Sequence, residues 1–97
     1  MKKLVVSPKA YDDLLQILRY IAKDRPTAGV ALVDQLQEQC EFLARFPDSG
    51  TKLDDVVPNL RVFSYRGYGI YFRNLDDLIR VERVLAPGLE IRSSLFE

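Results

Sequence analysis

Three β-type runs in the second half of the chain decide the fold. They lie in the stretch 60–85, which reads LRVFSYRGYGIYFRNLDDLIRVERVL. Gly67 separates the run Leu60 to Arg66 from the run Tyr68 to Asn74, and residues 75–77 separate the second run from Leu78 to Leu85. Breaks this short join neighbouring antiparallel strands. The stretch therefore predicts a three-stranded antiparallel meander.

Polar and apolar side chains alternate along these runs. The apolar positions of one parity are Ile70, Phe72, Ile79, Val81 and Leu85. The opposite parity holds Tyr71, Arg73, Arg80 and Glu82. Successive side chains of a strand point to opposite faces of the sheet. We therefore expect one face of the sheet to pack on helices and the other face to be polar and aromatic.

The first half of the chain predicts a strand followed by two helices. Leu4 to Val6 is a short β-rich run, and Ser7-Pro8 supplies an N-cap hydroxyl and a proline at the first helical position. Apolar residues then recur at helical spacing from Ala10 to Ala22. A break at residues 24–27 precedes a second helical pattern that ends before Pro47. We expect one α+β domain over residues 1–97, an N-terminal strand, an antiparallel αα-hairpin and the meander, in the order β-α-α-β-β-β.

Composition excludes several function classes. The 14 Lys and Arg residues balance 14 Asp and Glu residues, which removes the overall charge that a dedicated nucleic-acid or membrane binder carries. The chain has no histidine, so it lacks a His general base, a Ser-His-Asp triad and a His-ligated zinc site. Cys40 is the only cysteine, and its apolar neighbours at helical spacing predict a buried thiol. We expect no catalytic residue, no metal and no cofactor.

The N-terminal residues do not form a targeting or membrane segment. The apolar run after Lys3 stops at Ser7-Pro8, far short of a signal sequence or a membrane span. With a single cysteine and no disulfide, a reducing compartment is the simpler interpretation. We expect a cytoplasmic protein.

Arginine is concentrated in the meander, where five arginines and no lysine occur between Arg61 and Arg83. One interpretation is a binding face on which arginine forks and aromatic rings meet RNA or an acidic protein surface. The other is a solvated face with cross-strand charge pairs, such as Arg80 or Arg83 near Glu82. Together with the apolar C-terminal end, the residues predicted to contact a target are Arg61, Arg66, Tyr71, Arg73, Arg80, Leu95 and Phe96.

The first helix carries a wide apolar stripe. The stripe either completes a small core or forms a groove for an amphipathic segment of a partner, in which apolar anchors every three or four residues set the register. The residues predicted to line such a groove are Tyr11, Leu14, Leu15, Leu18 and Ile21.

Short motifs follow one another along nearly the whole chain. They are Ser7-Pro8-Lys9-Ala10, Asp13-Leu14, Ile17, Tyr20-Ile21-Ala22, Phe46-Pro47-Asp48-Ser49-Gly50, Asn59-Leu60-Arg61-Val62-Phe63, Tyr68-Gly69-Ile70-Tyr71-Phe72-Arg73 and Val84-Leu85. In this order and spacing they resemble the ParE branch of the RelE/ParE toxins. The resemblance implies the toxin of a bacterial type II toxin–antitoxin module, bound in a hetero-oligomer by a ParD-like antitoxin. It also implies that the toxin poisons DNA gyrase, through the A subunit, by protein–protein binding and without catalysis.

The segment after the last strand departs from this family. ParE toxins commonly have His-Gly-x-Arg-Asp-Ile there, whereas this chain has Ala86-Pro87-Gly88-Leu89-Glu90-Ile91. Two alternatives therefore stay open. The chain is a ribosome-dependent mRNA endonuclease of the RelE type, for which Arg61, Arg66 and Arg80 correspond to the basic residues of that branch, or an inactive homologue that only binds antitoxin.

Overall fold

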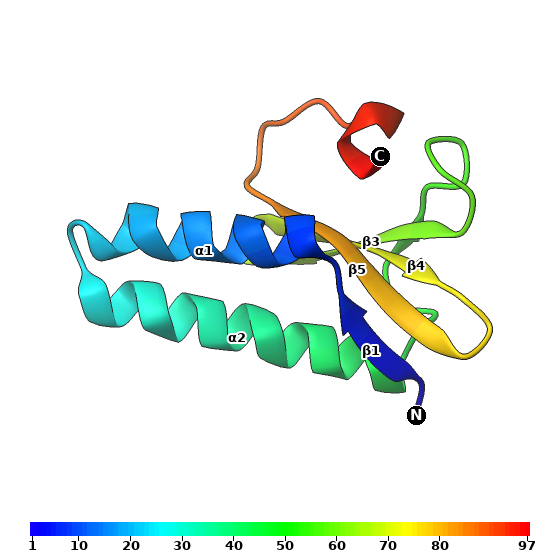
Figure 1. Cartoon of the computed structure of the whole chain (residues 1–97), viewed down its shortest axis with the longest axis horizontal. Coiled ribbons are helices and arrows are strands. Elements are labelled where there is room, and N and C mark those ends of the chain that lie inside the picture. The colour runs from blue at the N-terminus through cyan, green and yellow to red at the C-terminus, as the bar shows by residue number, and fades with distance from the viewer.

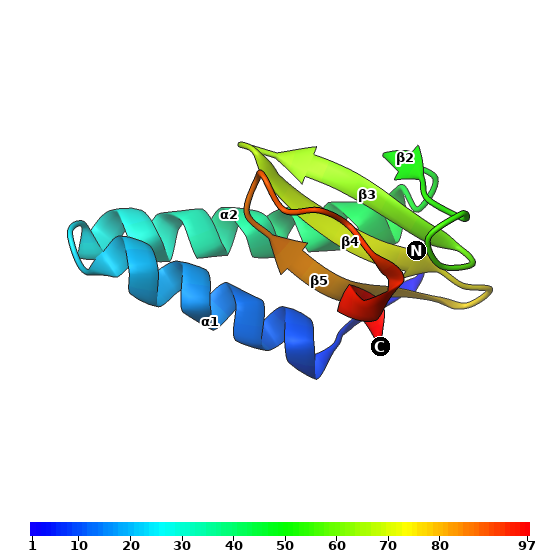
Figure 2. The same ribbon diagram turned by 90° about the horizontal axis from the view of Figure 1, so that it is seen from above.

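The helix hairpin and the sheet form two layers, and the turn between the helices lies away from the sheet (Figures 1 and 2). The computed structural model describes all residues, 1–97. Its elements are β1 (Lys3–Val6), α1 (Pro8–Ala22), α2 (Pro26–Arg45), β2 (Thr51–Lys52), β3 (Leu60–Tyr65), β4 (Tyr68–Asn74), β5 (Leu78–Leu85) and the short 3-10 helix η1 (Ser93–Phe96). The predicted α+β fold, with a strand, a helix hairpin and an antiparallel meander, is confirmed.

The sheet has five strands in the order β1-β5-β4-β3-β2. The meander β3-β4-β5 is antiparallel throughout, as expected. Two edge strands complete it: β2 pairs antiparallel with β3, and β1 pairs parallel with β5, Leu4 opposite Ile79. The connection from β1 to β5 runs through the helix hairpin and the strands β2 to β4, and it provides the long crossover that a parallel pair requires.

Ser7 turns the chain from β1 into α1. Its backbone N–H donates to the Val81 carbonyl (2.9 Å) and so ends the parallel ladder. Its Oγ accepts a hydrogen bond from the Ala10 N–H (3.1 Å) and donates one to the Glu82 carbonyl (2.9 Å). Pro8 occupies the first helical turn, where a missing N–H costs nothing. The predicted cap is therefore present, and it also attaches α1 to β5.

The core lies between the hairpin and one face of β4 and β5. Its buried side chains are Ala10, Leu14, Leu36, Cys40, Leu43, Ile70, Phe72, Ile79, Val81 and Val84. The two helices approach closely at Gly29, where a Cβ atom would lie 3.1 Å from the Leu18 carbonyl oxygen. A larger residue there would push the helices apart. Neither helix is at once long and apolar enough to cross a membrane.

A β-bulge changes the face of the residues at the end of β5. Phe72 pairs with Val81 but Tyr71 pairs with Arg83, so Glu82 is an extra residue. An extra residue reverses the alternation of the strand beyond it. Val84, opposite Ile70, consequently joins the core, while Leu85 pairs with Gly69. The expectation that Leu85 shares the face of Val81 is wrong for this reason.

Candidate functional sites on two surfaces

An apolar groove runs between the two helices and is lined by residues of both. Four of the five residues predicted for it, Tyr11, Leu14, Leu15 and Leu18, line a hollow of about 200 Å³ together with Val30 and Val33 of α2. We call this the hairpin groove. Ile21 is half-buried but does not line it. Tyr11 and Val30 are 57% and 53% exposed, which is unusual for side chains with so much apolar area.

The hairpin groove continues toward the sheet edge. A second hollow of about 340 Å³ shares Tyr11, Leu14 and Gln37 with it and extends to Leu4 and Val6 of β1. Three polar side chains border the two hollows: Asp34, Gln37 and Glu41. Two of these carry negative charge. The groove is therefore an apolar channel with an acidic rim.

Cys40 lies beneath this channel and is buried. Burial, with a smaller contribution from the nearby Glu41 carboxylate, raises the pKa of the thiol to about 12. A thiol with so high a pKa carries almost no thiolate at neutral pH, and the thiolate is the reactive form. Cys40 is a core residue and not a nucleophile.

The predicted arginines do not share one face, and the placement expected for Arg61 and Arg66 is wrong. Arg61 pairs with the core residue Phe72, and its Nη1 donates to the Asp48 carbonyl (2.9 Å) at the turn after α2. Its side chain is only 13% exposed. Arg66 lies in the β3–β4 turn and donates to Gln35 Oε1 of α2 (3.0 Å). Both long side chains reach toward the helix layer because backbone and amide acceptors lie there.

Arg73 and Arg80 lie on the opposite side of the sheet with Glu82 between them. The carboxylate of Glu82 is 3.3 Å from Arg80 Nε and 3.9 Å from Arg73 Nη1. Tyr71 belongs to the same face, and burial raises the pKa of its hydroxyl. We call the sheet face of Tyr71, Arg73, Arg80 and Glu82 the outer face. The sequence pattern predicted this part of the arginine face correctly.

The tail, residues 86–97, folds back over the outer face and ends in η1 (Figures 1 and 2). The ring of Phe96 packs on Tyr71, with 5.5 Å between ring centroids. Leu95 and Phe96 also border a hollow of about 270 Å³ between the start of α1 and the outer face, together with Lys9 and Arg80. Both apolar tail residues therefore lie beside the outer face, as the sequence suggested.

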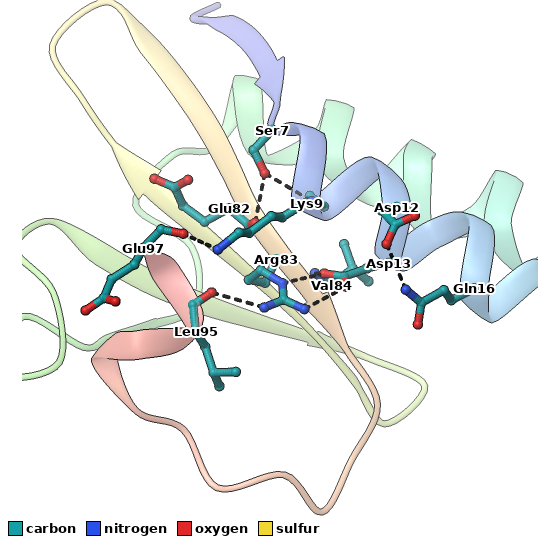
Figure 3. Close-up of polar contacts among 11 residues, drawn as sticks. Ser7, Lys9, Asp12, Asp13, Gln16, Glu82, Arg83, Val84, Leu95 and Glu97 are labelled. Carbon is teal, nitrogen blue, oxygen red and sulfur yellow. Dashed lines mark hydrogen bonds and ion pairs between the residues drawn. The ribbon is translucent and has the colours of Figure 1, made fainter.

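An ion pair that the sequence did not predict joins α1 to β5. Arg83 Nε and Nη2 donate to the two carboxylate oxygens of Asp13, each at 2.8 Å (Figure 3). Asp13 also accepts the Val84 N–H at 3.0 Å, at the edge of β5 that β1 no longer covers. These hydrogen bonds raise the pKa of the Arg83 guanidinium. The available signal was the position of Asp13, which lies at helical spacing from the buried Ala10 and from Ile17.

A larger groove lies on the other side of α1, between that helix and the tail. Its volume is about 510 Å³, and Tyr20 and Leu89, which are 78% and 54% exposed, stand at its margin. Ile17, Tyr68 and Leu85 form much of its apolar lining. We call it the tail groove. Sequence patterns did not predict the tail groove, because its walls come from three separate segments of the chain.

Comparison with known proteins links this geometry to one family. The model of the ParE toxin of the type II toxin–antitoxin system parDE matches residues 4–86. Toxin RelE3 of Caulobacter vibrioides is 27% identical over 85 residues, which is 87% of this chain and 92% of that protein. The solved chromosomal ParDE TA system from P. aeruginosa contains a chain with the same fold, with a TM-score of 0.78 and 22% identity over 91% of this chain and 98% of that one. Most of the tail lies outside the matched family region.

Proposed function

This chain belongs to the ParE toxin family of type II toxin–antitoxin systems, and from this premise we propose that a ParD-like antitoxin neutralises it and that it poisons DNA gyrase by protein–protein binding. The antitoxin would occupy the hairpin groove, and the A subunit of gyrase would meet the outer face and the tail. The toxin would act as a cytoplasmic binding protein and not as an enzyme.

The hairpin groove is the observation that carries the antitoxin part of the proposal. Tyr11 and Val30 expose more than half of their surface at the groove, and a partner helix with apolar anchors every three or four residues would bury them. The acidic rim of Asp34 and Glu41 favours a segment that carries basic residues beside those anchors. The solved relative is part of a chromosomal ParDE system, which supports a partner of this kind.

The outer face supports the gyrase part. Tyrosine and arginine are the residues that most often anchor protein interfaces, and Tyr71, Arg73 and Arg80 lie together there. Glu82, the carboxylate of this face, is engaged by both arginines. A carboxylate in that position is poorly suited to act as a free general base. These features favour binding over catalysis.

A supercoiling reaction tests this proposal. Purified toxin added in excess to gyrase and relaxed plasmid should stop supercoiling, and a stoichiometric amount of antitoxin should restore it. The double variant Arg73→Ala, Arg80→Ala serves as the matched control and should inhibit less. Unchanged supercoiling at toxin excess would reject gyrase as the target.

One observation favours a second function, an mRNA endonuclease of the RelE type. Tyr71 and two arginines on one face supply a hydroxyl that can act as an acid and cations that can bind phosphate, two of the groups that metal-free RNA cleavage needs. Primer extension on translated message after induction would then show new 5′ ends that Tyr71→Phe abolishes. If growth and message are both untouched while antitoxin still co-purifies, the chain is an inactive homologue.

A further inference from the structure

One guanidinium connects three segments of the chain. Arg83 of β5 uses Nε and Nη2 for the carboxylate of Asp13 on α1 and uses Nη1 for the Leu95 carbonyl in η1, at 3.1 Å (Figure 3). The side chains of Arg83 and Asp13 are 19% and 8% exposed. A bidentate pair of this kind is stronger and more directional than a surface ion pair, because water competes less with it.

The tail has few other polar attachments to the rest of the chain. Residues 86–92 have no helix or strand. Lys9 donates to the Glu97 carbonyl, but this contact is exposed. The pair Arg92–Glu90 joins two residues within the tail and is also exposed, so it ties the tail to nothing else. Arg83 is therefore the fixed donor to which the end of the tail is attached.

The position of the attachment matters because of what the tail covers. The Leu95 carbonyl is held by Arg83, and the next residue, Phe96, packs on Tyr71 of the outer face. Asp13 fixes the guanidinium in turn, since its two oxygens accept from Nε and Nη2 and leave Nη1 directed at the tail. Because the guanidinium is planar, the directions of its N–H donors are fixed relative to one another.

We propose that the Asp13–Arg83 pair is a positioning device that holds the tail on the outer face and so gives the target-binding surface its shape. The role in toxicity rests on the proposed function, whereas the attachment of the tail does not. Neither residue needs to contact the target. Loss of the pair would leave the hairpin groove, on the far side of α1, able to bind antitoxin.

Three measurements test this inference: amide hydrogen exchange, growth after induction and antitoxin binding. The Leu95 N–H, which donates to the Arg92 carbonyl in η1, reports on the tail, and the amides of β4 report on the core. The variants are Arg83→Lys, which keeps the charge but loses the planar fork, and Asp13→Asn. Asp12→Asn is the matched control because it removes a carboxylate from the adjacent position of α1, where Asp12 is exposed and bonds only Gln16.

In Arg83→Lys and Asp13→Asn, the Leu95 amide should exchange about tenfold faster, as expected for loss of a charge-assisted contact. The β4 amides should accelerate only as far as the loss of global stability, measured by urea denaturation of the same variants, accounts for. Growth arrest should weaken to the level of Phe96→Ala, and antitoxin should still co-purify. Asp12→Asn should match the wild type in all three measurements.

Three outcomes would overturn the proposal: an unchanged Leu95 rate in both variants, a Leu95 amide that exchanges only through the same opening as the β4 amides, or a released tail with undiminished growth arrest. If the wild-type chain itself does not arrest growth, the proposed function fails separately. The Leu95 rate then still decides whether the pair holds the tail.

Discussion

The hairpin groove and the outer face are built in different ways. The groove is made by two long helices, its walls are apolar, and its side chains continue into the core. The outer face is charged and is bordered by an irregular tail, which is held by the hydrogen bond from Arg83 to the Leu95 carbonyl, the exposed Lys9–Glu97 contact and one aromatic contact. The shape of a surface made of core elements changes only when the fold changes. The position of a tail held by a few contacts can change while the fold stays the same. The family match, which covers the helices and sheet but stops at residue 86, follows the same division.

The largest expected effect on stability comes from placing a charge at a residue of the hairpin groove that also belongs to the core. Leu14 is 3% exposed and lies in the core cluster. Leu14→Asp would bury an unpaired carboxylate and should lower the free energy of unfolding by more than about 4 kcal/mol. Urea denaturation followed by circular dichroism measures it. Leu18→Asp, at a half-buried position of the groove, is the control and should fold while binding antitoxin less well.

The next effect concerns the ion pair behind the tail. Asp13→Ala leaves Arg83 and the Val84 N–H without their acceptor, and we expect a loss of about 3 kcal/mol in the free energy of unfolding. The neighbouring Asp12 is exposed and bonds only Gln16 in the same helix. Asp12→Ala should therefore cost less than about 0.5 kcal/mol. Equal losses in the two variants, measured by urea denaturation, would show that the pair contributes little.

A third prediction separates the two grooves that flank α1. Tyr11 lines the hairpin groove and Tyr20 the tail groove, and both are exposed. Tyr11→Ser should weaken binding of an antitoxin C-terminal peptide by about 2 kcal/mol, while the free energy of unfolding stays nearly constant. Calorimetric titration of Tyr11→Ser and Tyr20→Ser makes the comparison. A larger loss in Tyr20→Ser would move the antitoxin to the tail groove.

The buried thiol under the hairpin groove gives a pH-dependent prediction. Above pH 9.0, the ordinary pKa of the thiol, the unfolded chain loses the Cys40 proton, but the folded chain keeps it up to about pH 12. The stabilising contribution is complete below pH 9 and is lost between those values. The free energy of unfolding should fall by about 1.4 kcal/mol per pH unit from this group. Denaturation curves of Cys40→Ala, compared with the wild type across this range, should show a shallower decline; identical slopes would mean that the thiol is accessible.

The smallest effect on stability belongs to the outer face. Each of Arg73→Ala and Arg80→Ala leaves Glu82 with the other arginine, so the free energy of unfolding should change by about 0.5 kcal/mol or less. Growth arrest should nevertheless weaken in both. Thermal denaturation measures the stability of each variant, and induction in culture measures its growth arrest. Variants that unfold would show that these arginines belong to the structure and not to a binding surface.

The sequence predicted the elements well where local signals were strong. Gly67 and the acidic residues 76–77 marked the strand ends closely, and Ser7-Pro8 marked the start of α1. The parallel pairing of β1 with β5, the two-residue strand β2 and the bulge at Glu82 were missed. The first joins segments distant in sequence, the second is too short to show an alternating pattern, and a single extra residue leaves no periodic signal.

The candidate surfaces were predicted less evenly. The apolar stripe of α1 fixed four residues of the hairpin groove, because a helix face follows from its own spacing. The arginines were harder to place, since a long side chain selects its partner by tertiary distance. Arg61 and Arg66 turned toward acceptors near α2, and Arg83 reached Asp13, although all three occur in the same run of sequence as Arg73.

The parallel pairing of β1 with β5 has a consequence for the order of events during synthesis. It joins the first strand of the chain to the last, and pairings between distant segments form late because closing a long loop costs entropy. The helices can form while the ribosome is still translating, but the sheet edge next to α1 closes only after β5 has emerged. The hairpin groove would thus take shape before the outer face, and a growing chain would be able to meet its antitoxin before it is able to harm the cell.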